Sequence, residues 1–282
     1  FISLNGTTGE VYKGKVETKA AEVSGDFAAL MDLCNKYTKL NVRTNADTPH
    51  DAEVARAFGA SGIGLCRTEH MFFDAEKIVA MREMILSPDV EGRRKALAKL
   101  LPFQKADFKG IFKAMDGCPV NVRLLDPPLH EFVPHDAKGQ EEMAKAMGVT
   151  VQEIKKRVES LCEHNPMLGH RGCRLGNTYP EITEMQTQAI LGAAIELKKE
   201  GYDPHPEIMV PLTGILYEFE AQEKVIRDAA AALFEKEGME IPFKVGTMIE
   251  IPRAALTANR IASRAEYFSF GTNDLTQMTF GY

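Results

Sequence analysis

The chain has 282 residues, of which 44% are hydrophobic and 26% charged, as in ordinary soluble globular proteins with one large domain or two modest ones. The formal net charge of −6, with no Trp and no dense run of Lys or Arg, argues against a nucleic-acid surface. No stretch approaches the roughly 18 apolar residues that a membrane-spanning helix needs. We therefore expect neither nucleic acid nor membrane as a partner.

The five cysteines are odd in number and lack Cys-x-x-Cys spacing, which argues against a disulfide framework and against a zinc site. They fit a reducing compartment, so we expect the protein in the cytoplasm or in a reducing organelle lumen and not outside the cell. Because the chain is acidic, an anionic ligand would need a local cluster of arginines.

The first residues predict a β-hairpin over 2–14, because Asn5-Gly6 is a tight-turn signal between two short β-prone runs. A hairpin of this size is not stable by itself, so it either packs on the following domain or is the last part of a preceding one. We prefer the second interpretation, in which residues 1–17 are the tail of a preceding domain. Apolar residues at helical spacing then predict a linker helix over 18–40.

From residue 41 onward, short strands alternate with helices, which predicts parallel pairing with crossover helices. Strands are expected at residues 41–45, 62–66, 119–125, 172–176, 207–211, 243–249 and 267–270. Seven such units within residues 41–282 fit an α/β fold, a (β/α)₈ TIM-type barrel that lacks its last βα unit in this chain. A helical insertion, over 140–163, is expected after the third strand.

A doubly wound open sheet is the alternative fold. Its usual ligand would be a dinucleotide, held by a glycine-rich turn that follows a strand. The glycine cluster of residues 59–64 instead precedes a strand and does not match G-x-G-x-x-G, which argues against that site.

Charged side chains follow several of the expected strands, at the barrel end where functional residues collect. These are Arg67, Arg123, Arg171, Arg174, Glu250 and Asp274. Arginine forks bind phosphate and carboxylate in bidentate geometry, so the cluster suits a small, dense anion. Two carboxylates at adjacent strand ends, without a cluster of His or Cys, indicate Mg²⁺ and not zinc.

The stretch from Gly271 to Asp274 adds backbone N–H groups at an expected helix start, where an anion can bind. Each of these residues also has a simpler interpretation. A single arginine at a strand end is more often part of a surface ion pair, Glu250 could serve only to begin the next helix, and Asp274 could serve only as its cap.

Five blocks along the chain resemble the pyruvate phosphate dikinase family. In chain order they read GLCRTEHMFF (64–73), VRLLDPPLHEF (122–132), HRGCRLG (170–176), GTMIEIPRAAL (246–256) and FSFGTNDLTQ (268–277). Phosphoenolpyruvate synthases and enzyme I of the sugar phosphotransferase system share the RTE-like and GTND-like blocks. The LLDPPLHEF block is similar to the dikinases specifically, which argues against enzyme I and its sugar-transport carrier partner.

The resemblance implies a Mg²⁺-dependent phosphotransferase that interconverts ATP, pyruvate and phosphate with AMP, phosphoenolpyruvate and pyrophosphate. It implies a swivelling phosphohistidine domain in the same full-length chain, which visits the barrel and whose tail is residues 1–17. It also implies a homodimer. Arg67 and Arg123 are implied to be catalytic and to hold the phosphoryl group, and Glu250 and Asp274 to bind Mg²⁺. The implied substrate-binding residues are Arg67, Arg123, Glu250, Ser269, Gly271, Thr272, Asn273 and Asp274, with Arg171 and Arg174 as further candidates.

The family's proton donor is a cysteine in a loop after the eighth strand, and none of the five cysteines here matches it. The phosphorylated histidine of the swivelling domain has no match either. We therefore expect residues 1–282 by themselves to be inactive. The alternative from another class is a barrel that binds a ligand without turning it over.

Overall fold

The computed structural model describes residues 1–18 and 23–281, and its contacts divide the chain into two units, residues 1–41 and 42–282. Within the described ranges, no helix is both long and apolar enough to cross a membrane.

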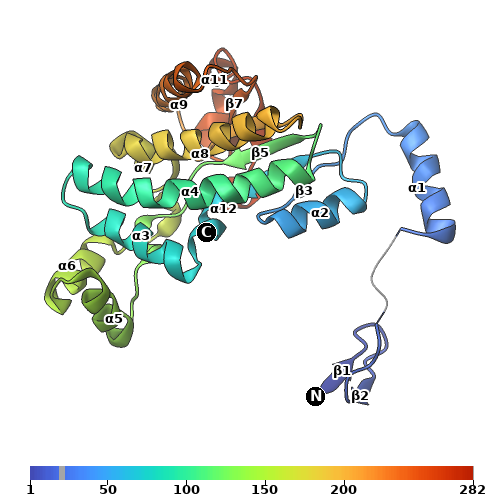
Figure 1. Cartoon of the computed structure of the whole chain (residues 1–282), viewed down its shortest axis with the longest axis horizontal. Helices are drawn as coiled ribbons and strands as arrows, with labels where there is room; N and C mark the ends of the chain where they lie inside the picture. Colours follow the sequence, from blue (N-terminus) through green and yellow to red (C-terminus); the bar gives the residue numbers. More distant parts are fainter. Residues whose placement is uncertain (19–22, 282) are drawn as a thin grey trace. The chain divides into compact units, whose positions relative to one another are not determined.

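The first unit begins with the predicted hairpin, in which β1 (Ile2–Leu4) and β2 (Val11–Lys13) pair antiparallel (Figure 1). The predicted tight turn is wrong. The connection is a wider loop, closed by a bond from the Asn5 N–H to the Glu10 carbonyl oxygen at 2.9 Å. Asn5 Oδ1 accepts from the Thr7 N–H at 3.1 Å, so the Asn side chain shapes the loop as an Asx turn.

The linker helix is present as α1 (Gly25–Tyr37). Residues 19–22 of the predicted helix lie outside the described residues. The assignment of residues 1–17 to a preceding domain stays a prediction.

The second unit is built on a parallel sheet with the strand order β3-β4-β5-β6-β7-β8. The strands are β3 (Thr44–Asn45), β4 (Ile63–Arg67), β5 (Pro119–Arg123), β6 (His205–Val210), β7 (Lys244–Ile249) and β8 (Phe268–Phe270). The helices around them confirm the α/β prediction of a partial TIM-type barrel.

Two bonds across one face of the sheet show how strongly it curls. Arg43, just before β3, forms a bidentate ion pair with Glu207 of β6, with Nη1 2.6 Å from Oε2. The Tyr267 hydroxyl, just before β8, donates to Asn121 Oδ1 of β5 at 2.9 Å. Each pair is separated by three strand spacings, about 14 Å in a flat sheet, so the sheet is curved as in part of a barrel.

The other face of the sheet is covered by helices. The bounds are α2 (Pro49–Ala57), α3 (Ala75–Leu86), α4 (Val90–Ala114), α8 (Pro180–Lys199), α9 (Leu216–Glu237), α10 (Pro252–Leu256), α11 (Ala258–Ile261) and α12 (Thr272–Phe280). α4 and α8 pack against each other, and α8 also packs on β6 (Figure 1). Alternate residues such as Val120 and Val122 of β5 enter this core, so the residues between them face the concave side.

The predicted helical insertion after β5 is two helices, α5 (Ala137–Met147) and α6 (Val151–Leu161). Gly148, with φ 66°, ends α5 in the left-handed conformation, and Thr150 and Glu153 form a capping box that starts α6. Their buried residues join a second core with α3 and the first half of α4.

The predicted strand at 172–176 is wrong, because this segment is the helix α7 (Gly172–Thr178). β5 pairs directly with β6, in continuous register from Pro119–His205 to Arg123–Met209, which leaves no place for a strand between them. The sheet therefore has six strands within the described residues, one fewer than predicted. Cys173 and Leu175 are both 1% exposed, so the segment's apolar residues are buried by α7 packing on its neighbours.

Candidate active site at the carboxyl end of the sheet

Arg67 and Arg123 are the last residues of β4 and β5, and their Cα atoms are direct partners in the ladder. Paired residues on neighbouring parallel strands project from the same face. The curled sheet therefore places both guanidinium groups at one end of its concave side, as the sequence predicted.

A network of buried carboxylates surrounds Arg123. Its Nη2 donates to Glu69 Oε1 at 2.6 Å, and its Nη1 lies 3.0 Å from Asp126 Oδ2. Arg171 Nη2 donates to the same Asp126 oxygen at 2.6 Å. Burial lowers the pKa of Arg123, but the Asp126 and Glu69 carboxylates outweigh it, so that its pKa is raised above the ordinary value.

Three atoms of this network have no hydrogen-bond partner among the described residues: Glu69 Oε2, Arg123 Nε and Asp126 Oδ1. Buried polar atoms are rarely left unpaired in a folded protein. Unused donors and acceptors at one point are typical of a site that a polar ligand completes.

Arg67 is held by Asp47, a residue that sequence reasoning missed. Asp47 Oδ1 accepts from the Arg67 backbone N–H at 2.7 Å, and Oδ2 lies 3.5 Å from Arg67 Nη1. The same Oδ2 lies 2.7 Å from His70 Nδ1. The signal that could have found Asp47 is its place two residues after β3. The Arg67 side chain remains 33% exposed, so its guanidinium group can still reach an anion.

Glu250 follows β7 and is 2% exposed. Its Oε1 accepts from the Leu212 N–H at 2.7 Å. Burial, followed by the charge of Asp126, raises the pKa of Glu250 to about 7, with a smaller contribution from Asp274. The Leu212 N–H and the positive charge of Arg123 act in the opposite direction. Glu250 therefore lies within the electrostatic field of both the arginine network and Asp274.

Gly271, between β8 and α12, lies directly against Glu250. A Cβ atom at position 271 would lie 2.6 Å from Glu250 Oε2, so the close approach requires glycine. Asp274 lies in the first turn of α12. Ser269 of β8 is half-buried beside Met248 of β7, while Thr272 and Asn273 are exposed at the start of α12.

The other two candidate arginines differ in position. Arg171 joins the network through Asp126, as above. Arg174 Nη1 donates to the Gly169 carbonyl oxygen at 2.8 Å, which ties the side chain to the loop before α7 and not to the carboxylates.

The oxygen ligands fit a magnesium ion. No group of three or more His, Cys, Asp or Glu within the described residues could hold a metal ion, so Glu250 and Asp274 are considered only as a pair of carboxylates, of which Asp274 acts electrostatically on Glu250. Mg²⁺ is usually bound in this way, by one or two carboxylates together with substrate oxygens and water. Burial first, and then the charge of Asp126, raises the pKa of Glu250, and a bound cation would oppose both effects.

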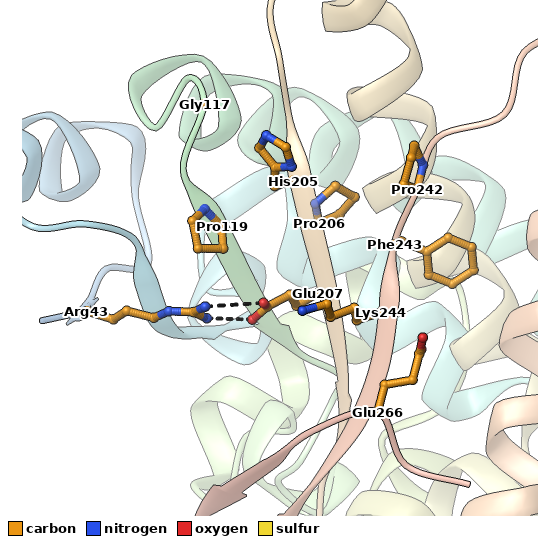
Figure 2. A pocket seen from close by; sticks show the side chains of 10 residues that line it. All are labelled: Arg43, Gly117, Pro119, His205, Pro206, Glu207, Pro242, Phe243, Lys244 and Glu266. Atoms are coloured by element: carbon orange, nitrogen blue, oxygen red, sulfur yellow. Dashed lines mark hydrogen bonds and ion pairs between the residues drawn. The ribbon is translucent and has the colours of Figure 1, made fainter. Parts of the chain in front are cut away.

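A cavity of about 560 Å³ lies at the opposite end of the sheet, lined by the first residues of β5, β6 and β7. Figure 2 shows the Arg43–Glu207 ion pair there, with His205 and Lys244 nearby. In barrels of this kind the amino ends of the strands contribute to stability, whereas function lies at the carboxyl ends. The arginine and carboxylate network is therefore the candidate site.

The family profile for the PEP-utilising enzymes, PEP-binding domain, matches residues 21–282. The chain belongs to this family. It is similar to pyruvate, phosphate dikinases: 57% identical to the one from Clostridium symbiosum and 58% to the one from Giardia intestinalis, each over 100% of this chain and 32% of the relative. A chloroplastic dikinase 1 of Oryza sativa subsp. japonica is 56% identical over 100% of this chain and 30% of its own length.

The chain thus spans about a third of the length of these relatives. Family membership agrees with the chemistry of the network. A PEP-binding domain must hold a molecule with a phosphate and a carboxylate, and guanidinium forks recognise both groups.

Proposed function

We propose that this PEP-binding domain carries the pyruvate and phosphoenolpyruvate half-reaction of a Mg²⁺-dependent pyruvate phosphate dikinase. The complete reaction interconverts ATP, pyruvate and phosphate with AMP, phosphoenolpyruvate and pyrophosphate. The observation that carries the proposal is the in-register pair of Arg67 and Arg123 beside the buried Glu250. The names of the similar dikinases support it.

In this proposal, Arg67 and Arg123 bind the phosphoryl oxygens and neutralise charge as the group moves. Phosphoryl transfer needs mainly positioning and electrostatic stabilisation, which two guanidinium groups at neighbouring strand ends can supply. Asp126 and Glu69 hold Arg123 in place. Arg171, bonded to Asp126, keeps that carboxylate oriented.

Glu250 and Asp274 would hold Mg²⁺, which when bound stabilises negative charge on a neighbouring substrate oxygen. Gly271, Thr272 and Asn273 would line the substrate site. Thr272 and Asn273 would offer backbone N–H groups at the start of α12, whereas the Gly271 N–H already donates to the Ile249 carbonyl oxygen at 3.1 Å. Ser269 would lie beside them.

The phosphoryl donor would be a phosphohistidine domain of the same full-length polypeptide, and the protein would be a homodimer. The proton donor would be a cysteine outside this chain, so residues 1–282 alone would not form phosphoenolpyruvate. All five cysteines are free, which supports our proposal of a reducing compartment, the cytoplasm or an organelle lumen.

The test is Arg67→Ala and Arg123→Ala in the full-length polypeptide that carries this chain. Each should lower phosphoenolpyruvate formation by about 100- to 1,000-fold, as for loss of a charge-stabilising donor. Isotope exchange between ATP and AMP, with phosphate and pyrophosphate present, should persist because the nucleotide chemistry lies on another domain.

The matched control is Arg94→Ala, which removes an exposed guanidinium that pairs with Glu184 on the helical face. It should retain both activities. Loss of ATP–AMP exchange in the Arg67 or Arg123 variant would contradict the proposed division of labour. Full phosphoenolpyruvate formation in both variants would show that Arg67 and Arg123 do not hold the phosphoryl group. A wild-type protein that binds phosphoenolpyruvate but forms none would favour the alternative, a barrel that binds without catalysis.

A further inference from the structure

Leu212 is the one non-glycine residue with positive φ among those that the structure describes, with φ 58°. It lies between β6 and α9 at the carboxyl end of the sheet, and its side chain is completely buried. Residues that carry a Cβ atom disfavour this left-handed conformation, so the surrounding structure must hold the Leu212 backbone in it.

Bonds on both sides of Leu212 hold its backbone. The Cys173 N–H donates to the Pro211 carbonyl oxygen at 3.1 Å, and Cys173 Sγ donates to the Leu212 carbonyl oxygen at 3.1 Å. On the other side, Thr247 Oγ1 and Thr213 Oγ1 are 2.7 Å apart. The segment is therefore fixed by α7 at its beginning and by β7 at its end.

Gly172 makes room for this arrangement at the start of α7. A Cβ atom there would lie 2.8 Å from Leu212 Cβ. The Gly172 N–H donates to the Asp126 carbonyl oxygen at 2.9 Å. The turn at Gly172 therefore contacts both Asp126, which holds Arg123, and Leu212, which holds Glu250.

The consequence of the left-handed conformation is the direction of the Leu212 N–H, which points at Glu250 Oε1 over 2.7 Å. Relaxation to a right-handed conformation would rotate this peptide group away. No described residue forms a hydrogen bond with Glu250 Oε2, which lies toward Gly271. One carboxylate oxygen is thus occupied by the backbone and the other is left for a ligand.

We propose that Leu212 is a positioning residue, whose strained backbone orients Glu250 so that Oε1 stays bonded to the backbone and Oε2 is left for the metal ion. The inference deepens the proposed function and rests on it. The alternative is that Leu212 only fills the core.

The test compares Leu212→Gly with Leu212→Ala in the full-length polypeptide. Both variants lose the leucine side chain beyond Cβ, and glycine loses Cβ as well, so packing alone would make the glycine variant the worse of the two. Glycine adopts positive φ freely, however, and alanine does not. In the presence of phosphoenolpyruvate, the glycine variant should therefore bind Mn²⁺ about tenfold more tightly than the alanine variant. Titration of free Mn²⁺ by electron paramagnetic resonance gives the dissociation constants. Hydrogen-exchange mass spectrometry over residues 205–214 should show slower opening in the glycine variant.

The matched control is the same pair of substitutions at Leu175, a residue of α7 that is 1% exposed and has no positive φ. At position 175, hydrogen exchange in α7 should be faster in the glycine variant than in the alanine variant, because glycine destabilises a helix. Equal Mn²⁺ affinity of the two Leu212 variants, or tighter binding by the alanine variant, would overturn the positioning role. Failure of the wild-type protein to bind Mn²⁺ with phosphoenolpyruvate would instead refute the proposed function, and this inference with it.

Discussion

Glu250→Gln should stabilise the protein at alkaline pH in the absence of metal. Burial and the neighbouring Asp126 charge raise the pKa of Glu250 from 4.5 to about 7, so the folded state holds a proton that the unfolded state releases above pH 4.5. Stability from this group is therefore present below pH 4.5 and is lost as the pH rises through about 7. Glutamine cannot ionise and avoids that loss.

The size of the stability gain follows from the rise of the Glu250 pKa from 4.5 to about 7, because a tenfold change in proton affinity corresponds to about 1.4 kcal/mol. The variant should exceed the wild type by about 3 kcal/mol in unfolding free energy at pH 8.5 and by less than about 1 kcal/mol at pH 5. Oε1 of glutamine can still accept from the Leu212 N–H, so the backbone contact is retained.

The measurement is urea unfolding in EDTA, monitored by hydrogen-exchange mass spectrometry over residues 205–214 and 244–251. These peptides report the unfolding of the segments around Glu250 alone. The control is Glu91→Gln, a carboxylate that is 79% exposed and should change stability by less than about 0.5 kcal/mol at both pH values. An equal gain for Glu250→Gln at pH 5 and pH 8.5 would refute the electrostatic reasoning.

Three further predictions concern the network and the far end of the sheet. Asp126→Asn should lower the unfolding free energy by about 3 kcal/mol, because Arg123 and Arg171 share that buried charge; unchanged urea unfolding would contradict it. Gly271→Ala should weaken Mn²⁺ binding with phosphoenolpyruvate about tenfold or more, because its methyl group would meet Glu250 Oε2; Gly6→Ala, where a Cβ meets nothing within 4 Å, is the control, and equal affinities would count against the contact. Glu207→Gln should destabilise the sheet by about 1–3 kcal/mol through the Arg43 pair and leave phosphoenolpyruvate affinity, measured by calorimetry, unchanged; a large loss of affinity would show that the two ends are coupled.

The sequence by itself determined the class of fold and placed most residues of the candidate site at strand ends. β4, β5 and β7 are short apolar runs bounded by glycine, proline or charged residues, and such runs predict buried parallel strands from local pattern alone. Once the strands are placed, Arg67, Arg123 and Glu250 follow as residues at strand ends, because the carboxyl ends of parallel strands meet at one edge. The blocks that resemble the dikinases contain these same positions.

Residues 172–176 show where local pattern was insufficient. A five-residue run with glycine at both ends fits a strand or a helical turn equally well, and periodicity cannot separate them over so short a length. The direct pairing of β5 with β6 decided between strand and helix. It leaves no place for residues 172–176 in the sheet, so they form part of the helix α7.

Only the tertiary structure showed which partners each charged residue has. Arg171 bonds to Asp126 whereas Arg174 bonds to a loop carbonyl, and no feature of the sequence separates these two arginines. The raised pKa of Glu250 and the left-handed backbone of Leu212 likewise arise from contacts between segments far apart in the chain. Local sequence determines which element forms, but burial, charge interaction and backbone strain depend on which distant elements pack together, and only the folded chain specifies that.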